Sequence, residues 1–115
     1  MGRLTTHVLD TAQGKPGAGI RIDLFRAGPE RQHVKTVFTN ADGRTNEPLL
    51  DDDAFCTSTW ELVFAVDEYF SRCGVVTDTP PFLDQVTLRF STAKDSHYHV
   101  PLLVSPWSYS TYRGS

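Results

Sequence analysis

The chain has 115 residues, of which 39% are hydrophobic and 22% charged, and its net charge is −3. This length and composition predict one globular domain over residues 1–115, with a core small enough that subunit assembly would add stability. The acidic balance argues against nucleic acid as a partner, because phosphate binding needs a concentrated basic face. We expect no membrane partner and a cytoplasmic location, since no segment has the apolar length of a membrane span or a signal-peptide core.

The chain contains two cysteines, Cys56 and Cys73, and they form no CxxC motif. Without a second pair, a reduced and partly buried state of both thiols is the simpler interpretation. A disulfide between them stays open at the level of sequence.

The first half of the chain alternates apolar and polar residues over short segments that turn residues separate. Alternation of this kind places one face of a strand against a core. The turn at 40–43 is the strongest signal, because Asn, Asp and Gly all tolerate positive φ. We therefore expect strands, in chain order, over 4–9, 20–26, 33–39 and 58–66.

One helix is expected, over 67–74. Asp67 can cap its N-terminus, Arg72 suits the last turn, and Gly74 can end it. The acidic Glu68 suits the first turn, where the helix dipole favours negative charge.

Beyond the helix, two further strands are expected over 85–90 and 97–104, and the tail 105–112 also has an extended pattern. Pro101 lies inside the second of these strands and predicts an edge, a bulge or a site there, because proline cannot donate to a ladder. Seven or eight short strands with one short helix indicate an all-β, two-sheet sandwich.

Two of the four histidines, His97 and His99, are two positions apart. On a strand, residues at this spacing point to the same face. Imidazole is a common zinc ligand, and His7 could supply a third ligand. An isolated pair on a strand is more often a half-buried polar pair than a metal site, so the spacing alone favours the plainer interpretation.

The chain ends on residues that are dense in hydroxyl and aromatic groups, including Trp107, Tyr109 and Tyr112. Chain ends are usually frayed and plain in composition. This ending therefore indicates a segment that packs against something, and a sandwich edge or a subunit interface explains it as well as a site does. Arg44, just after the 40–43 turn, is by itself an ordinary loop charge.

Taken together, these residues resemble the 5-hydroxyisourate hydrolases, the transthyretin-like proteins of purine breakdown. Residues 6–11 (THVLDT) with 14–16 (GKP) resemble the opening signature, and 39–45 (TNADGRT) resemble the second block. Residues 97–106 (HYHVPLLVSP), running into 109–115 (YSTYRGS), resemble the third and most specific block.

The resemblance spans His7 to Ser115, and the ending YRGS at 112–115 separates the hydrolases from transthyretin, the vertebrate hormone carrier of the same fold. The chain departs from the family pattern at 80–84, and the acidic segment 51–53 is not diagnostic. Both lie in expected loops, so they affect local geometry rather than the chemistry.

The resemblance implies two four-stranded antiparallel sheets with a short helix, assembled as a homotetramer that is a dimer of dimers. Active sites would then lie in a channel at the interface between dimers. The implied reaction is hydrolysis of 5-hydroxyisourate to 2-oxo-4-hydroxy-4-carboxy-5-ureidoimidazoline, in which water attacks a ring carbonyl and an amide C–N bond opens.

The resemblance also assigns roles to named residues. His7 and His99 would be base and acid, because an unperturbed imidazole titrates near about pH 6.5. Arg44 would bind the anionic ring and its oxyanion, since a guanidinium is planar, charged and rich in donors. Tyr112 and Ser115 would hydrogen-bond the substrate or the attacking water.

His97 would either orient its neighbour or hold zinc, and the resemblance implies no requirement for a metal or another cofactor. Which histidine takes the first proton stays open.

Three other functions remain to be weighed. A non-catalytic transthyretin-like ligand-binding module would be expected to lack His7, Arg44 and the YRGS ending. A zinc-dependent hydrolase built on His97 and His99 would be sensitive to chelators. A generic adhesive sandwich would need neither the placed histidines nor the unusual ending.

Overall fold

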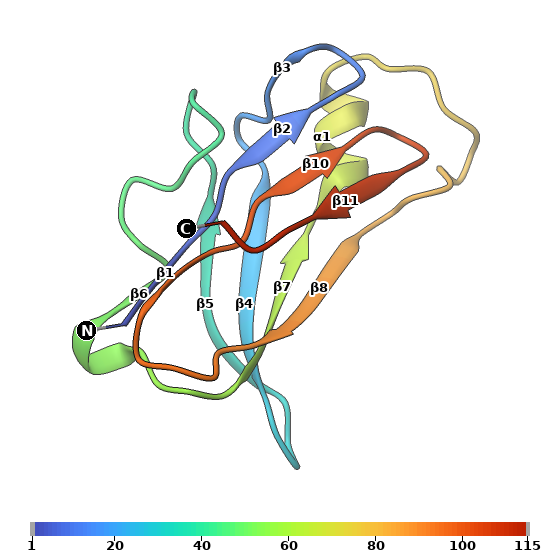
Figure 1. Ribbon diagram of the computed structural model, residues 1–115. Coiled ribbons are helices and arrows are strands. Elements are labelled where there is room, and N and C mark those ends of the chain that lie inside the picture. Colours follow the sequence, from blue (N-terminus) through green and yellow to red (C-terminus); the bar gives the residue numbers. More distant parts are fainter. Residues whose placement is uncertain (1, 115) are drawn as a thin grey trace.

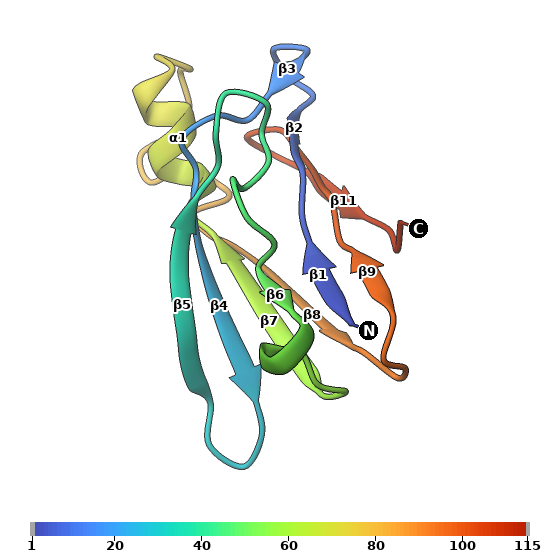
Figure 2. The ribbon, with the colours of Figure 1, turned by 90° about the vertical axis from the view of Figure 1, so that its left-hand side faces the viewer.

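The computed structural model describes residues 2–114 and arranges their strands in two facing layers, with a short helix at one end (Figures 1 and 2). This confirms the expected all-β sandwich with a short helix. The expected strands are more finely divided than the sequence pattern indicates. In chain order the elements are β1 (Arg3–Thr5), β2 (Val8–Asp10), β3 (Lys15–Pro16), β4 (Arg21–Ala27), β5 (Gln32–Phe38), β6 (Leu50–Asp51), the 3-10 helix Asp52–Ala54, β7 (Thr59–Phe64), α1 (Val66–Arg72), β8 (Val86–Ser91), β9 (His97–His99), β10 (Leu102–Val104) and β11 (Tyr109–Thr111).

One layer is a continuous sheet in the order β5-β4-β7-β8, with every neighbouring pair antiparallel. Its strands follow the predicted alternation: Ile22 and Leu24 are fully buried, whereas Arg21 is exposed on the opposite face. The register places Leu62 of β7 beside Leu24, so the apolar sides of neighbouring strands coincide. The result is an antiparallel sheet with one face buried in the core and the other exposed to solvent.

The other layer is interrupted. It consists of two shorter sheets, β6-β1-β9 and β11-β10-β2-β3, in which β2 continues β1 and β10 continues β9 (Figure 1). The segments expected as single strands over 4–9 and 97–104 are therefore each broken in the middle. Pro101 lies in the second break, as its missing N–H predicts. Two backbone hydrogen bonds of 2.9 Å hold the segments side by side across the break, from Val100 to Thr5 and from Leu102 to His7.

The two central segments of this interrupted layer run parallel: β1 pairs with β9, and β2 with β10. This differs from the antiparallel pairing expected throughout. The physical reason is that alternation of apolar and polar residues predicts a strand but does not predict which strand it pairs with or in which direction. Here the partners come from opposite ends of the chain, and Thr5 and His99 are 94 positions apart.

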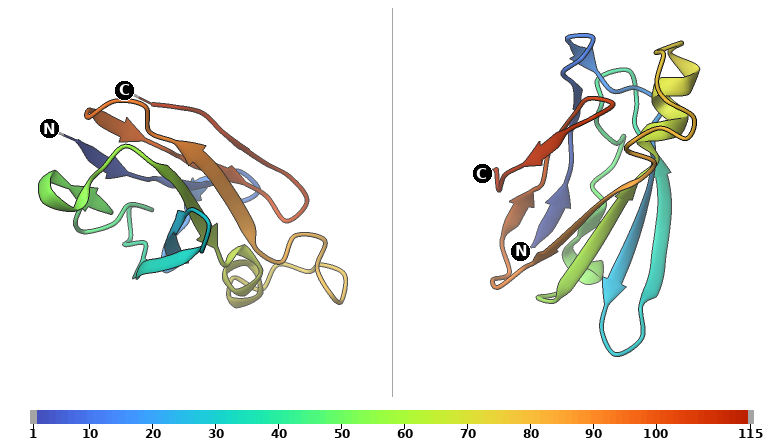
Figure 3. Two further views of the ribbon diagram at one scale, coloured as in Figure 1. Left: turned by 90° about the horizontal axis from the view of Figure 1, so that it is seen from below. Right: turned by 90° about the vertical axis from the view of Figure 1, so that its right-hand side faces the viewer.

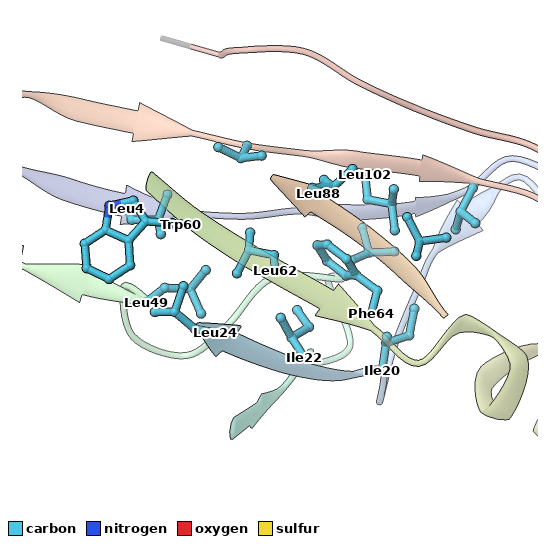
Figure 4. Packing of buried hydrophobic residues seen from close by; sticks show 14 of the residues in the cluster. Leu4, Ile20, Ile22, Leu24, Leu49, Trp60, Leu62, Phe64, Leu88 and Leu102 are labelled. Atoms are coloured by element: carbon cyan, nitrogen blue, oxygen red, sulfur yellow. The ribbon is translucent and has the colours of Figure 1, made fainter. Parts of the chain in front are cut away.

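The core lies between the layers. Figure 4 shows Leu4 and Leu102 of the interrupted layer on one side and Leu24, Leu62 and Phe64 of the continuous sheet on the other, and all five are fully buried. Burying one such side chain contributes about 1.5–3 kcal/mol. Leu4 and Leu102 lie on opposite sides of the break, so the core supports the interrupted layer on both sides of it.

The helix α1 falls close to the expected 67–74, but its beginning differs. Its N-cap is Ala65, without a side-chain cap, and Asp67 lies inside the first turn, so the expected capping role of Asp67 is wrong. β7 runs directly into the helix through the buried Ala65, which leaves no exposed position for a capping side chain. Gly74, with φ of +74°, ends the helix as expected.

Cys56 and Cys73 are both free and half-buried in the described chain, as the simpler interpretation predicts. Within residues 2–114, no helix has the length and apolar character needed to cross a membrane. Figure 3 shows the two layers from further directions, with both ends of the chain on the side of the interrupted layer. The outer face of that layer carries the site described next.

Candidate functional site

The break in the interrupted layer gathers three of the histidines on its outer face. Thr5 and His7 alternate with buried neighbours on one segment, and His97 and His99 flank the buried Tyr98 on the next, so all four lie on the outward face. The expectation that His97 and His99 share a face is confirmed. Together with the loop 44–48, Thr5 and both of these histidines border an open groove of about 470 Å³. A groove of this size suits a small molecule.

His99 is held at one ring nitrogen by Thr5. The register of β1 and β9 places Thr5 directly beside His99, and the Thr5 Oγ1 lies 2.8 Å from His99 Nδ1. The same oxygen lies 3.0 Å from the Nε2 of His97. Because Nδ1 is occupied, the ring nitrogen of His99 that remains free for chemistry is Nε2.

His7 is fixed by a backbone carbonyl. Its Nε2 lies 3.0 Å from the carbonyl oxygen of Asp42. A carbonyl can only accept, so Nε2 carries the hydrogen and Nδ1 of the neutral ring holds a lone pair. The two half-buried imidazoles therefore offer different free nitrogens, Nδ1 on His7 and Nε2 on His99.

Arg44 reaches the site through the predicted turn. The Asn40 side-chain oxygen accepts from the backbone N–H of Asp42 at 2.9 Å and of Arg44 at 3.2 Å. Gly43 has φ of +75°, and a Cβ there would lie 2.4 Å from the carbonyl oxygen of Val8. The turn therefore requires glycine, packs against β2 and places Arg44 in a β-bridge with His7.

The electrostatics of the groove favour neutral histidines. Burial, then the nearby Arg44 guanidinium, lower the pKa of His7, although its bond to the Asp42 carbonyl opposes this. Burial also lowers the pKa of His99, with further contributions from Arg44, His7 and His97. Both rings therefore keep a basic lone pair at neutral pH, which is the state a general base requires.

The chain end packs against His99 from another side. The backbone N–H of Gly114 donates to the carbonyl oxygen of His99 at 2.7 Å. The Arg113 guanidinium lies 4.4 Å from the centre of the Tyr98 ring, over its face. The terminal segment is thus anchored on β9 through Arg113 and Gly114, whereas its own aromatic residues Trp107, Tyr109 and Tyr112 are exposed.

The other residues predicted near the chain end are placed differently. Tyr112 is 58% exposed and borders a second groove, between β8 and β11, rather than the histidine groove. Ser115 lies outside the described residues. Within one subunit, the described chain therefore brings His7, Arg44, His97 and His99 together but leaves Tyr112 apart from them.

The described residues also bear on the zinc alternative. No group of three His, Cys, Asp or Glu side chains within residues 2–114 is placed to hold a metal ion. One nitrogen of His97 and one of His99 both hydrogen-bond to the Thr5 hydroxyl. These two nitrogens therefore contact a neutral side chain in the described structure.

Sequence reasoning missed Thr5 and Gly114 as contacts of His99. Both contacts depend on which strand lies beside β9, and alternation carries no such information. The only available signal was that Thr5 shares the outward face of its segment with His7.

Comparison with known proteins places this geometry in a family. The sequence model described as HIUase/Transthyretin family matches residues 4–114. A 5-hydroxyisourate hydrolase of Ralstonia nicotianae is 59% identical over 117 residues, covering 100% of both chains. The structure of Klebsiella pneumoniae 5-hydroxyisourate hydrolase matches with a TM-score of 0.81 at 30% identity, covering 100% of both chains. A crystal structure of (S)-allantoin synthase matches with a TM-score of 0.95 at 48% identity, covering 99% of this chain but only 44% of that one.

Proposed function

The chain belongs to the HIUase/transthyretin family, and we propose that it hydrolyses 5-hydroxyisourate to 2-oxo-4-hydroxy-4-carboxy-5-ureidoimidazoline in urate degradation, acting as a single domain. The observation that carries the proposal is that His99 and Arg44 border one groove, while His7 forms a β-bridge with Arg44 and lies near His99. Two imidazoles that favour the neutral state, beside a guanidinium, are the groups that amide hydrolysis requires. A carrier of a hormone or peptide would need none of them.

The reaction begins with attack of water on a ring carbonyl. One of the two histidines acts as base and takes a proton from this water, through the free Nδ1 of His7 or the free Nε2 of His99. Arg44 binds the anionic ring and stabilises the oxyanion that develops on the carbonyl, because a positioned cation is worth more in a partly dry groove than in water. The imidazolium formed in the first step then acts as acid and gives its proton to the leaving nitrogen as the C–N bond breaks. No cofactor is involved.

Tyr112 and Ser115 complete the proposed site by binding the substrate or the attacking water. Tyr112 borders a different groove within one subunit, so its role is best supported if a neighbouring subunit carries it to the histidines. We therefore place the reaction in a homotetramer, a dimer of dimers, with the histidine groove at a subunit interface. The outer face of the interrupted layer is open and suits such an arrangement.

We also propose that the protein is located in the cytoplasm. Two free, half-buried thiols fit a reducing compartment, where disulfides are rare. Cell fractionation with an antibody to the chain would place it.

The direct test couples urate oxidase to this protein and follows the ultraviolet absorbance of 5-hydroxyisourate as it decays. We expect decay well above the spontaneous rate, and a loss on the order of 10²-fold or more in His99→Ala, because positioned acid–base groups contribute about that much. Arg44→Ala should be similarly impaired, because it removes the guanidinium that stabilises the oxyanion while leaving the hydrophobic core intact. Thr36→Val, on the outer face of the other sheet, is the matched control.

If the folded protein does not accelerate the decay, the hydrolase proposal is wrong, and the alternative function, a non-catalytic ligand-binding module, is favoured instead.

A further inference from the structure

One hydroxyl lies between two histidine rings. Thr5 Oγ1 is 2.8 Å from His99 Nδ1 and 3.0 Å from His97 Nε2. A hydroxyl carries a single hydrogen, so it donates to one of these nitrogens and accepts from the other. The tautomers of the two neutral rings are therefore linked: a hydrogen on Nδ1 of His99 requires a bare Nε2 on His97, and the reverse arrangement exchanges them.

The two arrangements differ at the free nitrogen of His99. When Thr5 accepts from His99, the Nε2 of His99 holds a lone pair and can act as a base. When Thr5 donates to His99, that Nε2 carries a hydrogen and cannot. The Arg44 guanidinium on the wall of the groove favours the first arrangement, because a cation attracts an unprotonated nitrogen.

His97 is exposed and His99 is half-buried, so the Thr5 hydroxyl links a ring at the surface to one that is partly enclosed. Among residues 2–114, the other charged or titratable groups near the pair are Arg3 on β1, opposite His97, Arg44 and Glu47, which border the groove, and His7.

We propose that Thr5 is a positioning residue that selects the base-competent tautomer of His99 by donating its hydrogen to Nε2 of His97. The inference rests on the proposed hydrolysis for its effect on rate, but the linkage of the two rings is a property of the resting protein. No bond to the substrate is made by Thr5 or His97. Their effect is on which nitrogen of His99 holds the lone pair.

The kinetic test compares Thr5→Val, which keeps the shape and removes the hydroxyl, with Thr5→Ser, which keeps the hydroxyl. We expect Thr5→Val to lower kcat on the order of 10-fold to 100-fold with little change in KM, because the base is mispositioned rather than lost. Thr5→Ser should restore most of the rate. Thr36→Val again serves as control, and thermal unfolding monitors the fold of each variant.

The ring nitrogens separate tautomer selection from a structural role. NMR of the ring nitrogens should find His99 protonated on Nδ1 at neutral pH, and Thr5→Val should shift that hydrogen toward Nε2. His97→Phe removes the acceptor of the Thr5 hydrogen, so it should shift the His99 tautomer in the same direction and lower kcat with little change in KM.

Full activity and an unchanged His99 tautomer in Thr5→Val would overturn the proposal, as would a rate loss that Thr5→Ser does not restore. A His99 that keeps its hydrogen on Nε2 at neutral pH would overturn it as well. If the natural protein does not hydrolyse 5-hydroxyisourate, the proposed function fails, and NMR alone then decides whether Thr5 couples the two rings.

Discussion

At position 114 the chain comes so close to the ring of His99 that only glycine fits. A Cβ on Gly114 would lie 2.8 Å from Cδ2 of His99 and 3.1 Å from its Cβ. Together with Thr5 at Nδ1, this contact fixes the ring on two edges and leaves Nε2 facing outward. The glycine of the terminal motif thus fixes the orientation of the His99 ring, which we propose to be catalytic.

We expect Gly114→Ala to lower kcat for 5-hydroxyisourate about 10- to 100-fold, because a displacement near 1 Å at a reacting group can cost about that much. The coupled absorbance assay measures it. Gly28→Ala is a fitting control, since a Cβ there meets its nearest neighbour at an ordinary 3.7 Å. A fully active Gly114→Ala would mean that the ring tolerates the shift.

At the scale of elements, the helix α1 is tied to the interrupted layer by a buried carboxylate. The Tyr69 hydroxyl donates to Asp10 Oδ2 at 2.7 Å, and the side-chain amide of Gln13 donates to the same oxygen. Asp10 is 1% exposed, so its charge depends on these donors. Burial and the bond to Asp10 also raise the pKa of Tyr69, which keeps its hydroxyl a donor.

Tyr69→Phe should lower the free energy of unfolding by about 1–3 kcal/mol, because a buried charged acceptor loses a donor. Urea unfolding followed by fluorescence would measure the change. On an Asp10→Asn background the same substitution should cost less, since the acceptor is no longer charged. Equal losses on both backgrounds would assign the effect to packing of the ring instead.

The strands and the helix also show which structural features can be predicted from the sequence alone. Alternation located the long strands and the outward face of His97 and His99, and Gly74 marked the end of the helix. These are local features, set by neighbouring residues. The parallel pairing of β1 with β9 is not local, and the contact between Thr5 and His99 depends on it. The position of Arg44 beside His7 came from family resemblance, because a turn pattern does not say where its last residue points.

At the scale of the whole molecule, β8 and β11 are the outer strands of their sheets and border a common groove. Tyr109 and Tyr112 are exposed there, at 46% and 58%. Unpaired outer strands with exposed aromatic residues favour pairing with another copy of the chain. This edge is therefore the surface through which we expect subunits to associate.

Tyr109→Glu should shift the assembly from the proposed tetramer toward smaller species, because like charges would meet across paired edges. Sedimentation velocity would report the assembly, and the absorbance assay should register a parallel loss of activity per subunit. Val76→Glu places the same charge on an 88% exposed loop position and should change neither. If the variant dissociates but keeps full activity, the proposed site does not lie at a subunit interface.

The parallel pairing of β1 with β9 also has a consequence for synthesis. A ribosome releases β1 first, yet its partner β9 emerges only after the whole continuous sheet has been made. The apolar face of that sheet, with Leu24, Leu62 and Phe64, therefore stays incompletely covered until the last strands arrive. Long-range pairing of this kind slows folding and exposes nascent chains to aggregation. The histidine groove is consequently among the last features of the chain to form, and a nascent chain that stalls before residue 97 contains all four strands of the continuous sheet but lacks His97 and His99.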